Sequence, residues 1–189
     1  MRTARGRRVL ARTVLLGAAL SGVARSTIAA HPLAAVVLED DGGRSWQLSE
    51  LVGVPVLLVI ADRTASAEAS EWGRRLAATD APLVPWRTDG KVAWLAVADL
   101  RRVPDYARDA ARERMRAWEA GRSPGERKHS SPLLLDWNGQ VAGPFDTERG
   151  RVLVVLVGTD GRILVQARGT ATDAAVTQIQ QTIATVVGR

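Results

Sequence analysis

The stretch GVPVLLVIADRTASAEASEW, residues 53–72, decides the fold of this 189-residue chain. It opens with an unbroken run of valine, leucine and isoleucine over residues 56–60. Such a run is typical of a strand covered on both faces at the centre of a mostly parallel sheet. A short polar loop follows at residues 61–64, and the apolar spacing of residues 65–78 predicts a helix. We therefore expect a buried central strand that leads directly into a helix.

Strands and helices continue to alternate along the chain. Apolar runs predict two more buried strands, at residues 92–97 and 132–137. Between them, Pro104 fits the first turn of a helix that extends to about Ala120. Strands that alternate with helices imply a sheet with a parallel centre.

Shorter elements are predicted at both ends of this unit. Residues 36–38 and 44–48 flank a turn sequence and form a short hairpin candidate. Residues 152–158 and 162–168 flank an Asp-Gly pair, which is a strong signal for an antiparallel hairpin. Thr172 is placed to cap a final helix.

The helix predicted after Pro104 carries a basic stripe. Its apolar side chains are expected to face inward: Tyr106, Ala110, Met115 and Trp118. Its stripe consists of arginines four residues apart: Arg108, Arg112 and Arg116. We interpret the stripe as a solvated face with i,i+4 ion pairs. A site for an anionic ligand is the alternative.

The basic charge of the chain belongs to its N-terminus. The formal net charge is +6, and six of the 26 basic residues are arginines within the first thirty positions, where no acidic residue occurs. The remainder carries 20 basic and 20 acidic residues. A neutral remainder with no DNA-binding motif argues against a nucleic-acid partner.

Residues 1–30 have the pattern of a secretory signal peptide. A basic segment precedes an apolar segment at residues 14–24, and small residues near Ala29-His31 fit a cleavage site. The apolar segment is about half the ~20 residues that a membrane-spanning helix needs. We expect export to the periplasm or the exterior, and a single domain over residues 31–189. A disordered basic tail is the alternative.

The chain contains no cysteine. An exported protein without cysteine forms no disulfide, so its stability must come from its core. A thiol nucleophile, an iron–sulfur cluster and a cysteine-ligated zinc site are excluded. The motifs of common hydrolases, NTPases and dinucleotide-binding proteins do not occur either.

Three segments resemble a known superfamily. Residues 48–58, LSELVGVPVLL, are similar to the entry of the first central strand in thioredoxin-like proteins of the redoxin and TlpA-like branch. Residues 159–163, TDGRI, are similar to the hairpin turn of the same branch. Residues 60–68, IADRTASAE, resemble the segment that replaces the redox motif in cysteine-less periplasmic proteins of the YtfJ type.

This resemblance implies a three-layer α/β/α thioredoxin-like fold with a central mixed sheet. The implied order is β-α-β-α-β, then a β-hairpin and a C-terminal helix. It also implies that Ala65 and Glu68 stand where the redox cysteines would be, and that Val152 stands where these proteins place a cis-proline. Alanine and glutamate cannot exchange disulfides, so the implied fold comes without its thiol chemistry.

The loop at the start of the first helix is the candidate functional surface. Backbone N–H groups at a helix N-terminus attract anions. The candidate contact residues are Asp62, Arg63, Thr64, Ser66, Glu68 and Arg151. The competing interpretation gives Asp62, Thr64 and Ser66 only the role of capping the helix.

Neither histidine predicts a metal centre. His129 lies in a polar segment without a spaced partner, and His31 would be the first residue after cleavage behind Ala30. A terminal imidazole and amine could chelate copper, but a full site usually needs a second histidine. We predict no metal and no cofactor.

The sequence leads us to expect a binding or scaffold module of the cell envelope, without thiol–disulfide or peroxidase activity. Its partner would be an envelope protein or a small anion, and it would not be an integral membrane protein once the signal is removed. The alternatives are a thiol-independent enzyme that uses Arg63, Thr64 or Glu68, and an anion- or metal-binding protein that uses the loop of residues 62–68 or His31.

Overall fold

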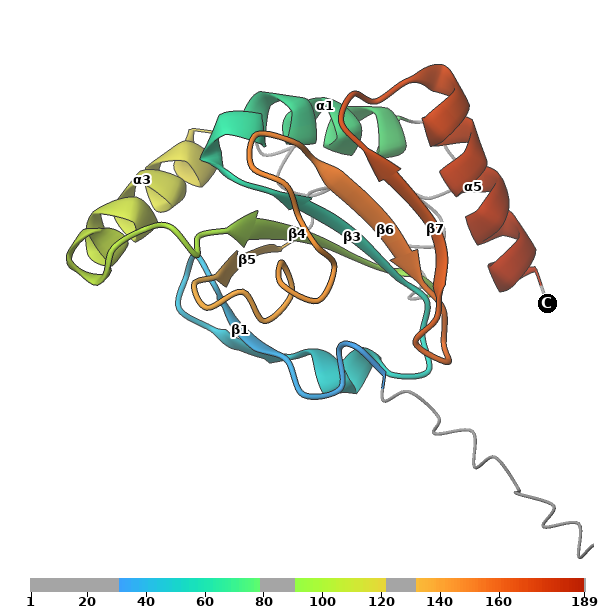
Figure 1. The fold of residues 1–189 in the computed structure, drawn as a ribbon, viewed down its shortest axis with the longest axis horizontal. Helices are drawn as coiled ribbons and strands as arrows, with labels where there is room; N and C mark the ends of the chain where they lie inside the picture. Colours follow the sequence, from blue (N-terminus) through green and yellow to red (C-terminus); the bar gives the residue numbers. More distant parts are fainter. Residues whose placement is uncertain (1–30, 79–90, 122–131, 189) are drawn as a thin grey trace, which may run out of the picture.

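The structure, a computed structural model, describes residues 31–78, 91–121 and 132–188. The predicted signal peptide and His129 lie outside these residues. Within them, seven strands form one sheet in the order β2-β1-β5-β4-β3-β6-β7 (Figure 1). The strands are β1 (Val37–Asp40), β2 (Ser45–Gln47), β3 (Val56–Ala61), β4 (Ala93–Asp99), β5 (Leu133–Asp136), β6 (Leu153–Val157) and β7 (Ile163–Arg168).

The centre of the sheet is parallel and the late hairpin forms an antiparallel edge, as predicted; the side of β1 and β2 is antiparallel as well. β3 pairs in parallel with β4, and β4 with β5. Leu58 lies opposite Leu95 in the first of these ladders. β6 and β7 form the predicted antiparallel hairpin beside β3, and β1 and β2 form the short hairpin beside β5.

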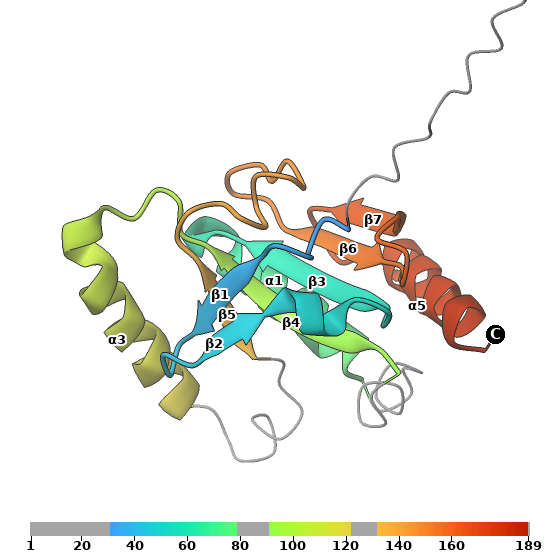
Figure 2. The same ribbon diagram turned by 90° about the horizontal axis from the view of Figure 1, so that it is seen from below.

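Helical segments follow the predicted order. The short 3-10 segments are η1 (Leu48–Leu51), η2 (Arg63–Ala65) and η3 (Asp105–Ala107), and the α-helices are α1 (Ser66–Leu76), α3 (Arg108–Ala120) and α5 (Asp173–Val187). Helices α1 and α5 cover one face of the sheet (Figure 1). Residues 33–36 and η1 lie on the other face, which Figure 2 shows from below. The mixed sheet and its helices confirm the predicted α/β thioredoxin-like fold.

β3 is buried on both faces, as its unbroken apolar run predicts. Leu57 and Val59 pack in the cluster beneath α1 and α5. Leu58 and Ile60 point to the opposite face, where they share a buried cluster with Phe145 of the β5–β6 loop. Each fully buried leucine side chain contributes about 2 kcal/mol of hydrophobic free energy relative to an exposed one. The strand that decides the fold is therefore also the centre of both cores.

One side-chain hydrogen bond attaches α1 to the end of β7, and another caps α5. Trp72 of α1 is fully buried, and its indole Nε1–H donates to the carbonyl of Gly169 at 2.6 Å. Thr172 caps α5 as predicted, because its Oγ1 accepts a bond from the N–H of Ala175 at 3.2 Å. On α5, Val176 and Ile179 then face the sheet.

The predicted inward face of α3 is wrong at two of its four residues, and the side chain of the fourth, Trp118, lies outside what the structure describes. Tyr106 is 91% exposed and Ala110 is also exposed, whereas Met115 is half-buried. Instead, Arg108 and Arg112 lie over the ring of Trp137, with guanidinium carbons 5.4 and 5.2 Å from its centroid. The physical reason is that arginine can cover an aromatic ring with its planar cation while its stem buries apolar surface.

The basic stripe of α3 is accordingly not a solvated face throughout. Arg112 also pairs with Glu39 of β1, at 2.7 Å between Nη2 and Oε2. An i,i+3 pair with Asp109 accompanies it at 3.3 Å. Arg116 alone of the three arginines is exposed. These contacts hold α3 beside β1 and β5 and engage two of the three arginines of the stripe.

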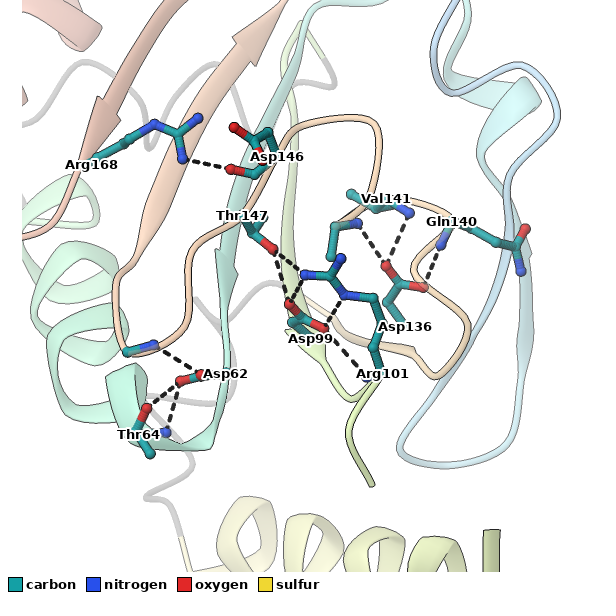
Figure 3. A network of polar contacts seen from close by, with 12 residues as sticks. Asp62, Thr64, Asp99, Arg101, Asp136, Gln140, Val141, Asp146, Thr147 and Arg168 are labelled. Atoms are coloured by element: carbon teal, nitrogen blue, oxygen red, sulfur yellow. Dashed lines mark hydrogen bonds and ion pairs between the residues drawn. The ribbon is translucent and has the colours of Figure 1, made fainter. Parts of the chain in front are cut away.

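Asp136, the last residue of β5, is fully buried and organises the loop that follows. Its carboxylate accepts three backbone N–H groups, from Gln140 at 2.8 Å, Val141 at 3.0 Å and Ala142 at 2.8 Å (Figure 3). A buried carboxylate needs such partners, because an unpaired charge in the core is costly. The loop is therefore folded around this one side chain.

We predict that Asp136→Ala lowers the free energy of unfolding by about 3 kcal/mol or more, because three N–H groups, two of them buried, lose their acceptor. Guanidinium denaturation measures the change. Asp109→Ala is the matched control, since it removes an exposed aspartate of α3 and should cost less than about 0.5 kcal/mol. Equal losses in the two variants would contradict the assigned role of Asp136.

Candidate functional site

Asp62 follows β3 and binds two parts of the chain at once. Its Oδ1 accepts bonds from the N–H of Thr64 at 2.9 Å, the N–H of Ala65 at 3.1 Å and the hydroxyl of Thr64 at 2.7 Å. Its Oδ2 accepts the N–H of Gly150 at 2.9 Å (Figure 3). Gly150 has a φ of 72°, a backbone conformation that favours glycine and that presents this N–H to Asp62. The carboxylate therefore joins η2 to the β5–β6 loop.

The expected set of outward N–H groups at the start of the first helix is not free. Asp62 already occupies the N–H groups of Thr64 and Ala65. Asp62 is thus the capping residue, and Thr64 donates to it rather than capping the helix itself. Ser66 is exposed, and α1 begins after Ala65 without any side-chain cap. Of the three residues for which the sequence predicted a capping role, Asp62 alone caps this helical segment, because its carboxylate accepts both N–H groups.

The positions assigned by resemblance to the redox residues lie together. Ala65 and Val152 are 3% and 1% exposed and belong to one buried cluster. Glu68 of α1 places its Oε2 3.5 Å from the N–H of Val152. No cis peptide bond occurs among the described residues, so Val152 follows a trans bond. This corner thus contains a buried methyl group and a carboxylate in contact with the start of β6.

A second carboxylate lies at the end of the neighbouring strand. Asp99, the last residue of β4, accepts two bonds from the guanidinium of Arg101, at 2.9 and 2.7 Å. The hydroxyl of Thr147 donates to Asp99 at 2.9 Å, and Arg101 also contacts that hydroxyl at 2.8 Å (Figure 3). Asp99 therefore binds the β5–β6 loop as Asp62 does, through a different residue of that loop.

A cavity of about 560 Å³ opens between the ends of β3 and β4. Its lining comes from η2, the β4–η3 loop and the β5–β6 loop, and consists of Asp62, Arg63, Thr64, Asp99, Leu100, Arg101, Arg102, Val103 and Arg149. Four guanidinium groups face two carboxylates in this set, so positive charge is in excess. Both carboxylates are already bonded within the protein.

The structure brings only part of the predicted contact surface to this cavity. Asp62, Arg63 and Thr64 line it, whereas Ser66 and Glu68 do not. Arg151 also points elsewhere, since it pairs with Glu148 at 2.9 Å.

Sequence reasoning missed the polar lining residues at the end of β4, after it and before Gly150: Asp99, Arg101, Arg102 and Arg149. A usable signal for the first three was present. Ligand sites of open α/β sheets lie beyond the carboxyl ends of parallel strands, and these residues end or follow the predicted second strand. The position of Arg149 depends on how a long loop folds back.

The pKa values of both aspartates are lowered. Burial raises the pKa of Asp62, but the hydrogen bonds from Thr64, Gly150 and Ala65 outweigh it, so the pKa lies below the usual 3.8. Burial likewise raises the pKa of Asp99, and the bonds from Arg101 and Thr147, with the charge of Arg101, bring it below 3.8. Both groups are therefore ionised acceptors at neutral pH and not proton donors.

His31 lies away from this cavity, against the turn between β6 and β7. A side chain at Gly161 would collide with it, because an added Cβ would lie 2.8 Å from its Cδ2. Its Nδ1 accepts the N–H of Leu33 at 3.3 Å. In the part of the chain that the structure describes, no three histidine, aspartate or glutamate side chains gather closely enough to hold a metal ion. The described helices also include none with the length and apolar character to cross a bilayer.

A buried parallel centre, a late hairpin and a helix that starts at the end of β3 define a thioredoxin-like fold. Known structures share it. Peroxiredoxin Q of Xanthomonas campestris is 13% identical, with a TM-score of 0.57 over 82% of this chain and 94% of its own. The pneumococcal exposed lipoprotein thioredoxin Etrx1 of Streptococcus pneumoniae is 15% identical, with a TM-score of 0.55 over 77% and 97%.

A third structure, a thiol:disulfide interchange protein DsbE from Chlorobium tepidum, is 17% identical, with a TM-score of 0.53 over 81% and 93%. No family model matches the sequence, and no curated protein matches it. At these identities the likeness establishes the fold alone. The predicted thioredoxin-like architecture is thereby confirmed.

We predict that Asp62 and Asp99 make the protein more stable above pH 3.8 than below it. A lowered folded-state pKa means that the stabilisation is complete above the unfolded value of 3.8 and is lost as the pH falls through the folded value. The contribution of each should not exceed about 1 kcal/mol, since both are partly solvated.

Denaturation curves from neutral pH to below 3.8 measure this effect. Asp62→Asn and Asp99→Asn should each flatten the acid side of the profile, and Asp109→Asn on the exposed face of α3 should not. A profile unchanged by either of the first two variants would refute the assignment.

Proposed function

We propose that this protein is a binding or scaffold module of the cell envelope that performs neither thiol–disulfide exchange nor peroxide reduction. The observation that carries the proposal is a thioredoxin-like fold on a chain with no cysteine. Thiol–disulfide exchange requires a thiolate that attacks sulfur. The signal-like pattern of residues 1–30 supports an envelope location, and one structural neighbour is itself an exposed lipoprotein.

The contacts around Val152 support a non-redox role. In this proposal Ala65 and Glu68 stand at the positions of the redox cysteines, and Val152 at that of the cis-proline. The N–H of Gly150 is bonded to Asp62, and the N–H of Val152 faces Glu68. Backbone groups satisfied within the protein cannot pair with an added extended peptide. The peptide-gripping edge of a redox protein would thus be closed by two of the chain's own carboxylates.

We place the protein with the cysteine-less YtfJ-type group on the segment IADRTASAE, residues 60–68. Asp62 and Thr64 in this segment form the bonded turn that opens η2. Aspartate and threonine at these positions therefore serve to hold the turn, a role that does not depend on a cysteine after it. The surface beside it, formed by Arg63 and the cavity, is the proposed contact for an envelope partner or a small anion.

A thiol-independent enzyme is less well supported by the same geometry. General acid catalysis at neutral pH needs a group whose pKa is raised toward the working pH. The pKa values of the two carboxylates in the cavity, Asp62 and Asp99, are instead lowered by their hydrogen bonds. Copper binding through His31 is also disfavoured, because its Nδ1 is engaged by the N–H of Leu33.

We predict that the purified protein shows no turnover above background in insulin-reduction and peroxidase assays. A cysteine-containing thioredoxin and a peroxiredoxin assayed alongside it provide the positive controls. Turnover by this protein would end the proposal, since no thiol is present to explain it.

The proposed positions of the redox cysteines are tested by restoring them. Ala65 precedes the first residue of α1, so Ala65→Cys with Glu68→Cys places two thiols across the first turn of a helix. We predict that mild oxidation closes a disulfide between them, which alkylation and mass spectrometry detect. Ala67→Cys with Ser70→Cys has the same spacing but lies inside the helix, and should oxidise more slowly. Equal rates for the two pairs would contradict the assignment.

A further inference from the structure

We propose that the cavity between η2 and the β4–η3 loop binds a phosphoryl group, either as free phosphate or as part of a small phosphorylated molecule. This inference rests on the proposed function, in which this side of the fold serves binding. It assigns the ligand chemistry and names the recognising residues: Arg63, Arg102 and Arg149.

These three arginines come from separate segments and converge on one opening. Arg63 lies in η2, Arg102 follows β4, and Arg149 lies in the loop before β6. All three are exposed, and none has a side-chain hydrogen bond or ion pair with any residue in the described ranges. Most other arginines near the loop are paired, as Arg101 is with Asp99 and Arg151 with Glu148.

The two carboxylates of the cavity offset only part of the charge of this cluster. One carboxylate oxygen of Asp62 accepts the N–H of Ala65 in η2, and the other accepts the N–H of Gly150. Asp99 is held by Arg101 and Thr147. Arg101 and Asp99 form one pair, so Asp62 is left against the three unpaired guanidinium groups. The net charge of the cavity lining is therefore about +2, and a ligand with about two negative charges would neutralise it.

A phosphoryl group matches this requirement better than a single carboxylate. A phosphate monoester carries close to two negative charges at neutral pH and offers three acceptor oxygens. Arginine pairs with such oxygens through two parallel N–H bonds, so several guanidinium groups can share one phosphoryl group. A carboxylate has one charge and two oxygens, and would leave part of the cluster unpaired.

The volume and the apolar lining of the cavity leave space for more of a ligand than its phosphoryl group. Its volume of about 560 Å³ falls within the ~300–1,000 Å³ of small-molecule sites. Leu100 and Val103 supply apolar surface beside the arginines. A phosphorylated molecule with an apolar part would use both features, whereas inorganic phosphate would use only the charged one.

Unpaired like charges in one cavity also destabilise the folded state when no anion is present. A ligand that binds the folded protein alone raises its apparent stability. The proposal therefore requires that phosphate stabilises the protein beyond the general screening that any salt provides.

The experiment measures thermal unfolding in sodium phosphate and in sodium chloride at equal ionic strength, together with titrations of inorganic phosphate, phenyl phosphate and benzoate. We expect a higher Tm in phosphate and saturable binding of both phosphates. Tighter binding of phenyl phosphate would identify a phosphorylated molecule as the source, and equal binding would identify free phosphate. Benzoate that binds as tightly as phenyl phosphate would overturn the proposal.

The variant R63Q/R102Q/R149Q should lose the phosphate-specific rise in Tm and bind phosphate at least about ten-fold more weakly, because three charge-assisted contacts are removed. Its Tm in chloride should be unchanged or higher, which also confirms that it folds. The control R114Q/R116Q/R162Q removes the same charge from exposed arginines of α3 and of the β6–β7 turn. It should keep the response. Equal losses in the two triple variants would overturn the site.

Failure of this site is distinguishable from failure of the proposed function. If phosphate-specific binding is absent and the redox assays are blank, the phosphoryl site is refuted and the non-redox role stands. A protein with thiol-type turnover loses the non-redox role, whatever it binds.

Discussion

Three aspartates at the ends of three parallel strands hold the long β5–β6 loop in place, and the arrangement of the site depends on them. Asp62 follows β3 and binds the N–H of Gly150, whereas Asp99 ends β4 and binds the hydroxyl of Thr147. Asp136 ends β5 and accepts three N–H groups at the start of the loop. Figure 3 shows these contacts side by side. The parallel register aligns the carboxylates, since Asp99 lies opposite Asp136 in the ladder.

These hydrogen bonds fix the loop in a chain that has no cysteine and so cannot fix it with a disulfide. A long loop across the ends of a sheet needs fixed attachments, because its backbone polar groups must find partners. Charged acceptors make stronger bonds to backbone N–H groups than neutral ones do. Because Asp62 and Asp99 are used in this way, the arginines that line the same cavity, Arg63, Arg102 and Arg149, have no partners among the described residues.

Local patterns predicted the strands and turns well, and predicted the faces of α3 poorly. The apolar run of β3 can be satisfied only by burial on both sides, so its place follows from composition. The outcome for α3 depended on a distant residue, Trp137, which offers a ring to Arg108 and Arg112. Periodicity treats arginine as a solvent-facing residue, and it has no means of recognising a cation that packs on an aromatic ring.

By itself, the sequence determined that this chain is an α/β protein with a parallel centre, a late hairpin and no thiol chemistry. These properties follow from residue types and their spacing, which act locally. Only the tertiary structure decided which polar groups meet. The sequence allowed Asp62 to be a helix cap or part of a binding surface. Its bond to Gly150, some ninety residues away along the chain, forms only because β3 and the loop pack together. Arg149 joined the cavity for the same reason, because loop folding and not local spacing sets its position.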